Sequence, residues 1–188
     1  MPRTSAKRAT PTTAADAIAL LEADHREVEA MFKKFEKTDD DEMKVQIASD
    51  ICKALTIHQI IEEEIFYPGV KDAVDEEIYT EAYVEHDGSK VLLAEIEAGS
   101  PDDEFYDAKV KVLSEMIKHH VAEEEQRNGM FAQAKRNEVD LIALGEAMAA
   151  RKEELLAEFE SAGLPPPETK VMRGGEIVQG AIEASQAA

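Results

Sequence analysis

The chain has 188 residues, a formal net charge of −20 and a single cysteine, so it is long enough to bury one sizeable hydrophobic core. No apolar run approaches the roughly 20 residues that a membrane-spanning helix needs, and the excess of carboxylates disfavours binding to nucleic acid or to an anionic membrane. The lone Cys52 rules out an intrachain disulfide framework and indicates a reducing compartment, so we expect a cytoplasmic protein.

The N-terminal part of the chain is predicted to be a disordered arm followed by a helix. Residues 1–13 are rich in Thr, Ala, Pro and basic side chains, a composition that does not support a packed core. From Ala14 to about Lys37 the apolar residues recur at helical spacing, and His25 lies in the middle of their face. The acidic turn at residues 38–41 is expected to cap the next helix.

The second helix is expected from about Asp41 to Tyr67, where Pro68 would end it because proline cannot continue a helix. Near its end His58 and Glu62 are four residues apart, so both project from the same, otherwise apolar face. Burying an imidazole and a carboxylate is costly unless another polar group or a metal ion pairs with them.

Two further bundle helices are expected, from about Asp72 to Ala98 and from about Asp103 to Arg136. The first carries His86 at the centre of its apolar face, and Gly99-Ser100-Pro101 stops it. Both helices therefore repeat the feature seen in the first half of the chain, a histidine within an apolar face.

The helix expected at residues 103–136 contains two adjacent His–Glu pairs, His119 with Glu123 and His120 with Glu124. The apolar face that leads to His120 is unbroken, whereas the face that leads to His119 contains Lys109. The sequence therefore favours His120 and Glu124 as the inward pair, and it leaves His119 and Glu123 as the alternative.

A fifth helix is expected from Asn137 to about Ala162, ended by Gly163 and a run of prolines. No strand pattern occurs, so we predict an all-α fold, an antiparallel up-down four-helix bundle with an additional C-terminal helix. The bundle domain would cover residues 14–162, and residues 163–188 would form a flexible or loosely docked tail.

The bundle sequence contains an internal repeat of helical hairpins. His25 and His58 are 33 positions apart and His86 and His120 are 34 apart, and each hairpin ends in His-x-x-x-Glu. Two such hairpins would bring four histidines and two glutamates into one layer of the core. Two buried carboxylates without a cation would cost several kcal/mol or show raised pKa values. Mixed histidine and carboxylate ligands on facing helices suit iron or manganese better than zinc.

These motifs resemble the hemerythrin-like, HHE cation-binding family over about residues 14–160. The resemblance is carried by the stretches around His25 and His86 and by the His58–Glu62 and His120–Glu124 blocks. It implies a non-haem centre of two irons per chain, oxo- or hydroxo-bridged. By resemblance His25 and His58 would cap one iron, His86 and His120 the other, and the two glutamates would bridge them.

The resemblance also implies a function in binding O2, peroxide or NO, for redox or oxygen sensing or for iron handling. Oxygen-carrying hemerythrins have a second histidine one turn after the third-helix histidine, where this chain has Lys90. Open positions at the irons would follow, which favours exchangeable ligands over reversible O2 transport. The alternative is an enzyme that disproportionates peroxide or handles NO.

Neighbouring side chains could support the ligands. Glu63, Glu64, Glu123 and Glu125 could orient the histidines through hydrogen bonds. Two tyrosines, Tyr83 and Tyr106, could donate hydrogen bonds to the centre, although core packing is the simpler interpretation for both.

Overall fold

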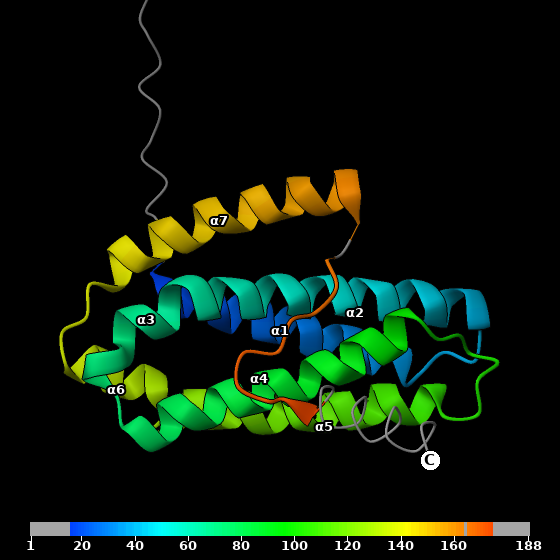
Figure 1. The fold of residues 1–188 in the computed structure, drawn as a ribbon, viewed down its shortest axis with the longest axis horizontal. Helices are drawn as coiled ribbons and strands as arrows, with labels where there is room; N and C mark the ends of the chain where they lie inside the picture. The colour runs from blue at the N-terminus through cyan, green and yellow to red at the C-terminus, as the bar shows by residue number, and fades with distance from the viewer. Residues whose placement is uncertain (1–15, 164, 175–188) are drawn as a thin grey trace, which may run out of the picture.

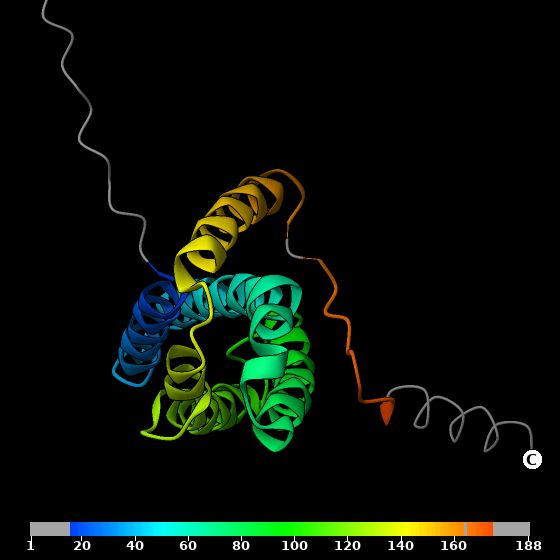
Figure 2. The ribbon, with the colours of Figure 1, turned by 90° about the vertical axis from the view of Figure 1, so that its left-hand side faces the viewer.

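The computed structural model describes residues 16–163 and 165–174 (Figure 1). The bundle consists of α1 (Ala17–Phe35), α2 (Asp41–Ile61), α4 (Glu76–Glu97) and α5 (Tyr106–Glu125). The additional helix α7 (Leu141–Ala162) lies across α1 and α2 on the outside of the bundle (Figures 1 and 2). This confirms the predicted fold, and the described residues contain no strand. The arm predicted at residues 1–13 lies outside the described residues.

Aspartates begin four of the five long helices, and in three of them the side chain caps the helix, α4 with Asp75 being the exception. The carboxylates of Asp16, Asp40 and Asp140 each accept a hydrogen bond from the backbone N–H three residues further on, at 2.9–3.0 Å. Such caps satisfy amide groups that a helix start leaves without a partner. Among the described residues, no helix combines the length and the apolar character that crossing a bilayer requires.

The second helix does not end at Pro68, and this expectation was wrong. It widens into a π-helical turn at Glu62–Phe66, in which the Tyr67 N–H donates to the carbonyl of Glu62, and then continues as α3 (Tyr67–Val70). A 3-10 turn, Lys71–Ala73, completes this segment. The wide turn lets the chain pass through a proline, and it adds one residue to the spacing of the side chains that follow.

The fourth bundle helix ends earlier than expected. It stops at Glu125, where Gln126 takes an extended backbone conformation, and a separate short helix α6 (Met130–Arg136) follows. The prediction of one continuous helix to Arg136 was therefore wrong. The break folds α6 back against the end of the bundle, where its Met130 and Phe131 are buried.

Gly129 makes this break possible, and Gly129→Ala is expected to destabilise the protein. A Cβ atom at this position would lie 2.1 Å from the carbonyl oxygen of Glu123 and 2.6 Å from that of Glu124. Both atoms belong to the backbone, so relief requires the end of α5 to move. We expect a loss of about 1–3 kcal/mol of unfolding free energy, measured by urea denaturation. Gly174→Ala, which meets no atom within 4 Å, is the control and should leave stability unchanged.

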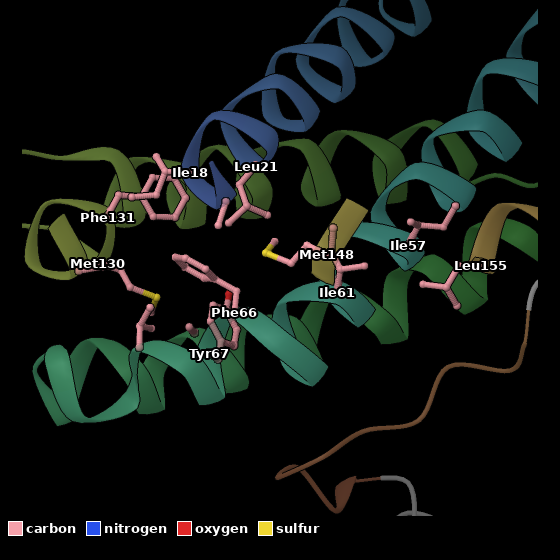
Figure 3. Close-up of a cluster of buried hydrophobic side chains, with 14 of the residues drawn as sticks. Ile18, Leu21, Ile57, Ile61, Phe66, Tyr67, Met130, Phe131, Met148 and Leu155 are labelled. Atoms are coloured by element: carbon pink, nitrogen blue, oxygen red, sulfur yellow. The ribbon is translucent and has the colours of Figure 1, made fainter. Parts of the chain in front are cut away.

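The apolar core consists of two clusters with a polar layer between them. One cluster lies under α7, α3 and α6, and Figure 3 shows its larger members, among them Leu21, Ile61 and Tyr67. The other fills the opposite half of the bundle, and it includes Val28, Leu55 and Cys52. On α1, His25 therefore lies between Leu21 of the first cluster and Val28 of the second. The two clusters close the polar layer from both sides.

Candidate metal centre

Each of the four bundle helices contributes one histidine to the polar layer. The ligand candidates predicted from the sequence are all at most 4% exposed, and all six meet here: His25, His58, Glu62, His86, His120 and Glu124. The two glutamates come from α5 and from the first residue of the π turn after α2. The bundle thus brings together residues that are up to 99 positions apart in the chain.

The histidines form two pairs. The Nε2 atoms of His25 and His58 are 3.2 Å apart, and those of His86 and His120 are also 3.2 Å apart. This is the pairing that the resemblance implies. That these nitrogens bind metal remains a prediction.

Each glutamate lies between the two histidine pairs. Glu62 Oε2 is 3.2 Å from Nε2 of both His58 and His86. Glu124 spans the other side, with Oε2 at 3.4 Å from His25 Nε2 and Oε1 at 3.7 Å from His120 Nε2. A carboxylate in such a place can bind one metal ion through each oxygen.

The alternative pair, His119 and Glu123, points outward. The side chain of His119 is 63% exposed and that of Glu123 is 29% exposed, and their closest atoms are 3.4 Å apart. The unbroken apolar face of α5 therefore selected the inward pair correctly.

Carboxylates stand behind the histidines, on the side away from the centre. Nδ1 of His25 lies 2.8 Å from Glu125, and Nδ1 of His86 lies 3.0 Å from Glu63. Nδ1 of His120 lies 2.8 Å from Glu85. Nδ1 of His58 faces Asp24 instead, at 3.7 Å, which is longer than a hydrogen bond. Carboxylates in this position accept a hydrogen bond from the Nδ1–H group and leave the Nε2 lone pair free for a metal ion.

Three of these carboxylates are held by permanent cations. Arg26 contacts Glu125 at 2.5 Å, Lys90 contacts Glu63 at 2.6 Å, and Lys152 of α7 contacts Asp24 at 2.5 Å. Sequence analysis anticipated Glu63 and Glu125 but missed Asp24 and Glu85. Glu64 and Glu123, also named as candidates, contact Arg151 and His119 instead.

Glu85→Ala is expected to weaken metal binding about 10–100-fold, because His120 would lose the group that fixes its ring and tautomer. Competition with a chromophoric chelator measures the change in dissociation constant. Glu81→Ala, an exposed position one turn earlier on α4, is the matched control and should bind like the parent protein. Equal affinities for both variants would show that Glu85 does not support the centre.

Burial lowers the pKa of two of the four histidines, whereas for His120 the effect of burial is outweighed by Glu124 and Glu85, which raise the pKa. Burial, aided by His58, His120 and Arg26, lowers the pKa of His25 to about 2, so the ring is neutral. Burial also lowers the pKa of His86, and it raises the pKa of Glu62 well above 4.5, with repulsion from Glu124 adding to the rise. Oε1 of Glu62 and Oε2 of Glu124 have no hydrogen-bond partner among the described residues. Burying these carboxylates without a partner costs free energy, and divalent cations would remove that cost. The residues present therefore fit a metal pair.

Metal uptake by the apoprotein is expected to release protons. The raised pKa means that the carboxyl of Glu62 keeps its proton in the folded apoprotein at pH values where a free carboxyl has lost it. A metal ion must displace that proton, so metal binding releases protons and affinity rises with pH. Calorimetry in buffers of different ionisation enthalpy counts the protons. Metal binding without any proton release would contradict the assignment.

Tyr67 adds a hydroxyl to the centre that sequence analysis did not identify. It is fully buried, and its Oη lies 3.1 Å from His86 Nε2, 3.4 Å from His120 Nε2 and 3.2 Å from Glu124 Oε1. Burial raises its pKa, and Glu124 and Glu62 add to the rise, so it is a neutral donor in the metal-free protein. Figure 3 shows its ring packed beside Phe66.

The π turn explains why Tyr67 was missed. Regular helical spacing from Glu62 puts Phe66 on the same face, whereas the wide turn moves Tyr67, five residues on, to the inner face. Of the tyrosines considered from the sequence, Tyr83 packs edge-on against Tyr67, with ring centroids 5.4 Å apart, and its hydroxyl contacts that of Tyr79. Tyr106 packs against Phe35, away from the layer.

Free space at the centre is small. A cavity of about 10 Å³ is lined by the four histidines together with apolar residues such as Leu55 and Ile117. This is about the space of one water molecule. The larger hollows, of 250–400 Å³, open on the surface away from the histidine pairs. The interior therefore admits only a very small ligand.

Comparisons with known proteins agree with this geometry. Residues 16–132 match the family model described as the hemerythrin HHE cation binding domain. A protein of Nostoc sp. (strain PCC 7120 / SAG 25.82 / UTEX 2576) named DNA nickase is 30% identical over 118 residues, which are 63% of this chain and 33% of that protein. The chain thus spans about a third of the length of this curated relative.

Among solved structures, the fold is similar to that of a hemerythrin HHE cation binding domain-containing protein from Mycobacterium kansasii. The TM-score is 0.62 at 19% sequence identity, and the match covers 80% of this chain and 95% of the other. At this identity the likeness supports the fold alone.

Proposed function

Because this chain belongs to the family of hemerythrin HHE cation-binding domains, we propose that its histidine and glutamate layer holds two iron ions. In this proposal His25 and His58 bind one iron, and His86 and His120 bind the other. Glu62 and Glu124 bridge the two. The observation that carries the proposal is the position of Glu62 Oε2, which is equidistant, at 3.2 Å, from one histidine of each pair.

The donor set supports iron over zinc. Structural zinc sites commonly include thiolate ligands, whereas this layer offers only imidazole, carboxylate and phenol groups. Cys52 lies in the apolar cluster on one side of the layer, where its thiol contacts the carbonyl of Leu93 at 3.8 Å. It is therefore not a candidate ligand.

We infer that the centre binds O2, peroxide or NO in redox sensing, oxygen sensing or iron handling. An iron pair supplies reversible one-electron oxidation and an open coordination position. The residues around it set the conditions: the two apolar clusters exclude bulk water, and the small cavity limits the ligand to a few atoms. The Tyr67 hydroxyl lies beside the pair formed by His86 and His120. There it can donate a hydrogen bond or itself bind the metal ion proposed for that pair.

The test is an anaerobic titration of the ferrous protein with NO, O2 and hydrogen peroxide, followed by optical and Mössbauer spectroscopy. We expect one equivalent of ligand or oxidant to convert one iron pair, with the same result in the exposed-site variant His119→Ala. Sustained turnover of peroxide or NO would instead establish the enzyme alternative. A spectrum unchanged by all three reagents would contradict both.

A further inference from the structure

In the described part of the segment that follows α7, the hydrogen bonds to the bundle all go to one residue, Asp87. We call residues 165–174 the C-terminal strap, and it runs from the end of α7 along the side formed by α2 and α4 (Figures 1 and 2). The fully buried carboxylate of Asp87 on α4 accepts hydrogen bonds from the backbone N–H groups of Lys170, Val171 and Met172, each at 2.7 Å.

Apolar packing contributes little to this attachment. The side chains of Val171 and Met172 are 52% and 39% exposed, and the other described strap residues are exposed as well. A segment with few buried contacts opens at a free energy well below that of global unfolding. Docking of the strap therefore depends on how well the bundle holds the carboxylate of Asp87 in place.

A continuous line of polar contacts connects Asp87 to the metal centre. Lys90 Nζ lies 3.5 Å from Asp87 Oδ1 and 2.6 Å from Glu63 Oε1. The same oxygen of Glu63 lies 3.0 Å from Nδ1 of His86, whose Nε2 faces the centre. Lys90 is 7% exposed, and the strap prolines Pro165–Pro167 cover a hollow of about 250 Å³ beside it. Charges shielded from water in this way interact more strongly than charges at the surface.

From this chain of contacts we infer that docking of the strap is coupled to metal occupancy at His86. The strap at the surface would then be docked more firmly when the centre holds metal than when it is empty. The inference rests on the proposed function. A metal ion on Nε2 fixes the ring with its Nδ1 proton toward Glu63, which in turn fixes Glu63 and Lys90. The carboxylate of Asp87 then keeps the orientation in which it accepts hydrogen bonds from the three backbone amides of the strap. Because coupling is reciprocal, strap docking must also strengthen metal binding.

Hydrogen–deuterium exchange of the full chain tests the inference, with the metal content of each sample measured in parallel. We expect the amides of Lys170, Val171 and Met172 to exchange at least about tenfold more slowly in the Fe(II)-loaded protein than in the metal-free protein, which corresponds to about 1.4 kcal/mol of coupling. Amides in the middle of α7 serve as the internal reference and should change less.

Two variants make the test specific. Lys90→Met keeps the stem but removes the charge that joins Glu63 to Asp87, so the strap amides should lose their dependence on metal. Asp87→Asn should speed strap exchange and weaken metal binding, whereas Glu168→Gln, an exposed strap position, should do neither. Two metal ions per chain with unchanged strap exchange would overturn this inference alone. A protein that binds no metal would overturn the proposed function, and the inference with it.

Discussion

Replacing Glu62 with Gln is expected to remove most bound metal while leaving the bundle folded. Glu62 contacts both histidine pairs, so its loss affects both metal positions, and a neutral amide is a poor bridging ligand. The fold should survive because burial raises the pKa of this carboxyl and so favours its neutral form, and Gln has nearly the same shape as the neutral acid. We expect metal content to fall at least about tenfold, a larger effect than the loss of an outer carboxylate.

Elemental analysis and circular dichroism on the same sample measure this prediction. Glu64→Gln is the matched control, because Glu64 lies two residues further on and pairs with Arg151 at the surface. A Glu62→Gln protein that keeps two metal ions would show that Glu62 does not bridge the pairs. Loss of helical structure together with the metal would assign Glu62 a structural role instead.

Tyr67→Phe is expected to change the visible spectrum of the oxidised, iron-loaded protein. The hydroxyl lies 3.1–3.4 Å from the nitrogens of His86 and His120, close enough to bind a metal ion placed at these two residues. A metal ion would lower the pKa that burial raises, and a phenolate on ferric iron absorbs visible light by charge transfer. Phe fills the same space, so the stability cost should be about 1–3 kcal/mol at most.

Resonance Raman spectroscopy with excitation in the visible band identifies the phenolate directly. Tyr83→Phe is the control, since among the described residues the hydroxyl of Tyr83 accepts a hydrogen bond from that of Tyr79, at 3.5 Å, and has none to the histidines or glutamates of the layer. If Tyr67→Phe and the parent protein have the same spectrum and bind metal equally, Tyr67 is a hydrogen-bond donor and not a ligand.

The meeting of the histidines and glutamates in one layer could be predicted from the sequence because it depends on features internal to each helix. His58 and Glu62 share a face whatever the neighbouring helices do, and the matched spacing of the two hairpins places all four histidines at one level. The choice of His120 over His119 followed from the apolar face of a single helix. The helical periodicity of each segment and the repeat of the two hairpins are enough to predict that these residues meet in the core.

The remaining parts of the site depend on information that periodicity does not contain. Glu85 and Asp24 reach their histidines from adjacent helices, so their role depends on how the helices are rotated in the bundle. Tyr67 depends on a π turn, and the break after Glu125 depends on Gly129, neither of which a regular helical pattern reveals. The docking of the strap on Asp87 uses backbone amides, which leave no side-chain signature in the sequence.

The measurement that tests the central claim most directly is the iron content of protein purified from iron-supplemented cells, beside a His58→Ala/Glu62→Ala variant. Plasma mass spectrometry gives iron per chain, and an absorption spectrum shows whether the irons form one coupled centre. We predict two irons per chain in the parent protein and almost none in the variant. Well-folded parent protein with iron near zero would contradict the assignment of the histidine and glutamate layer as a di-iron centre.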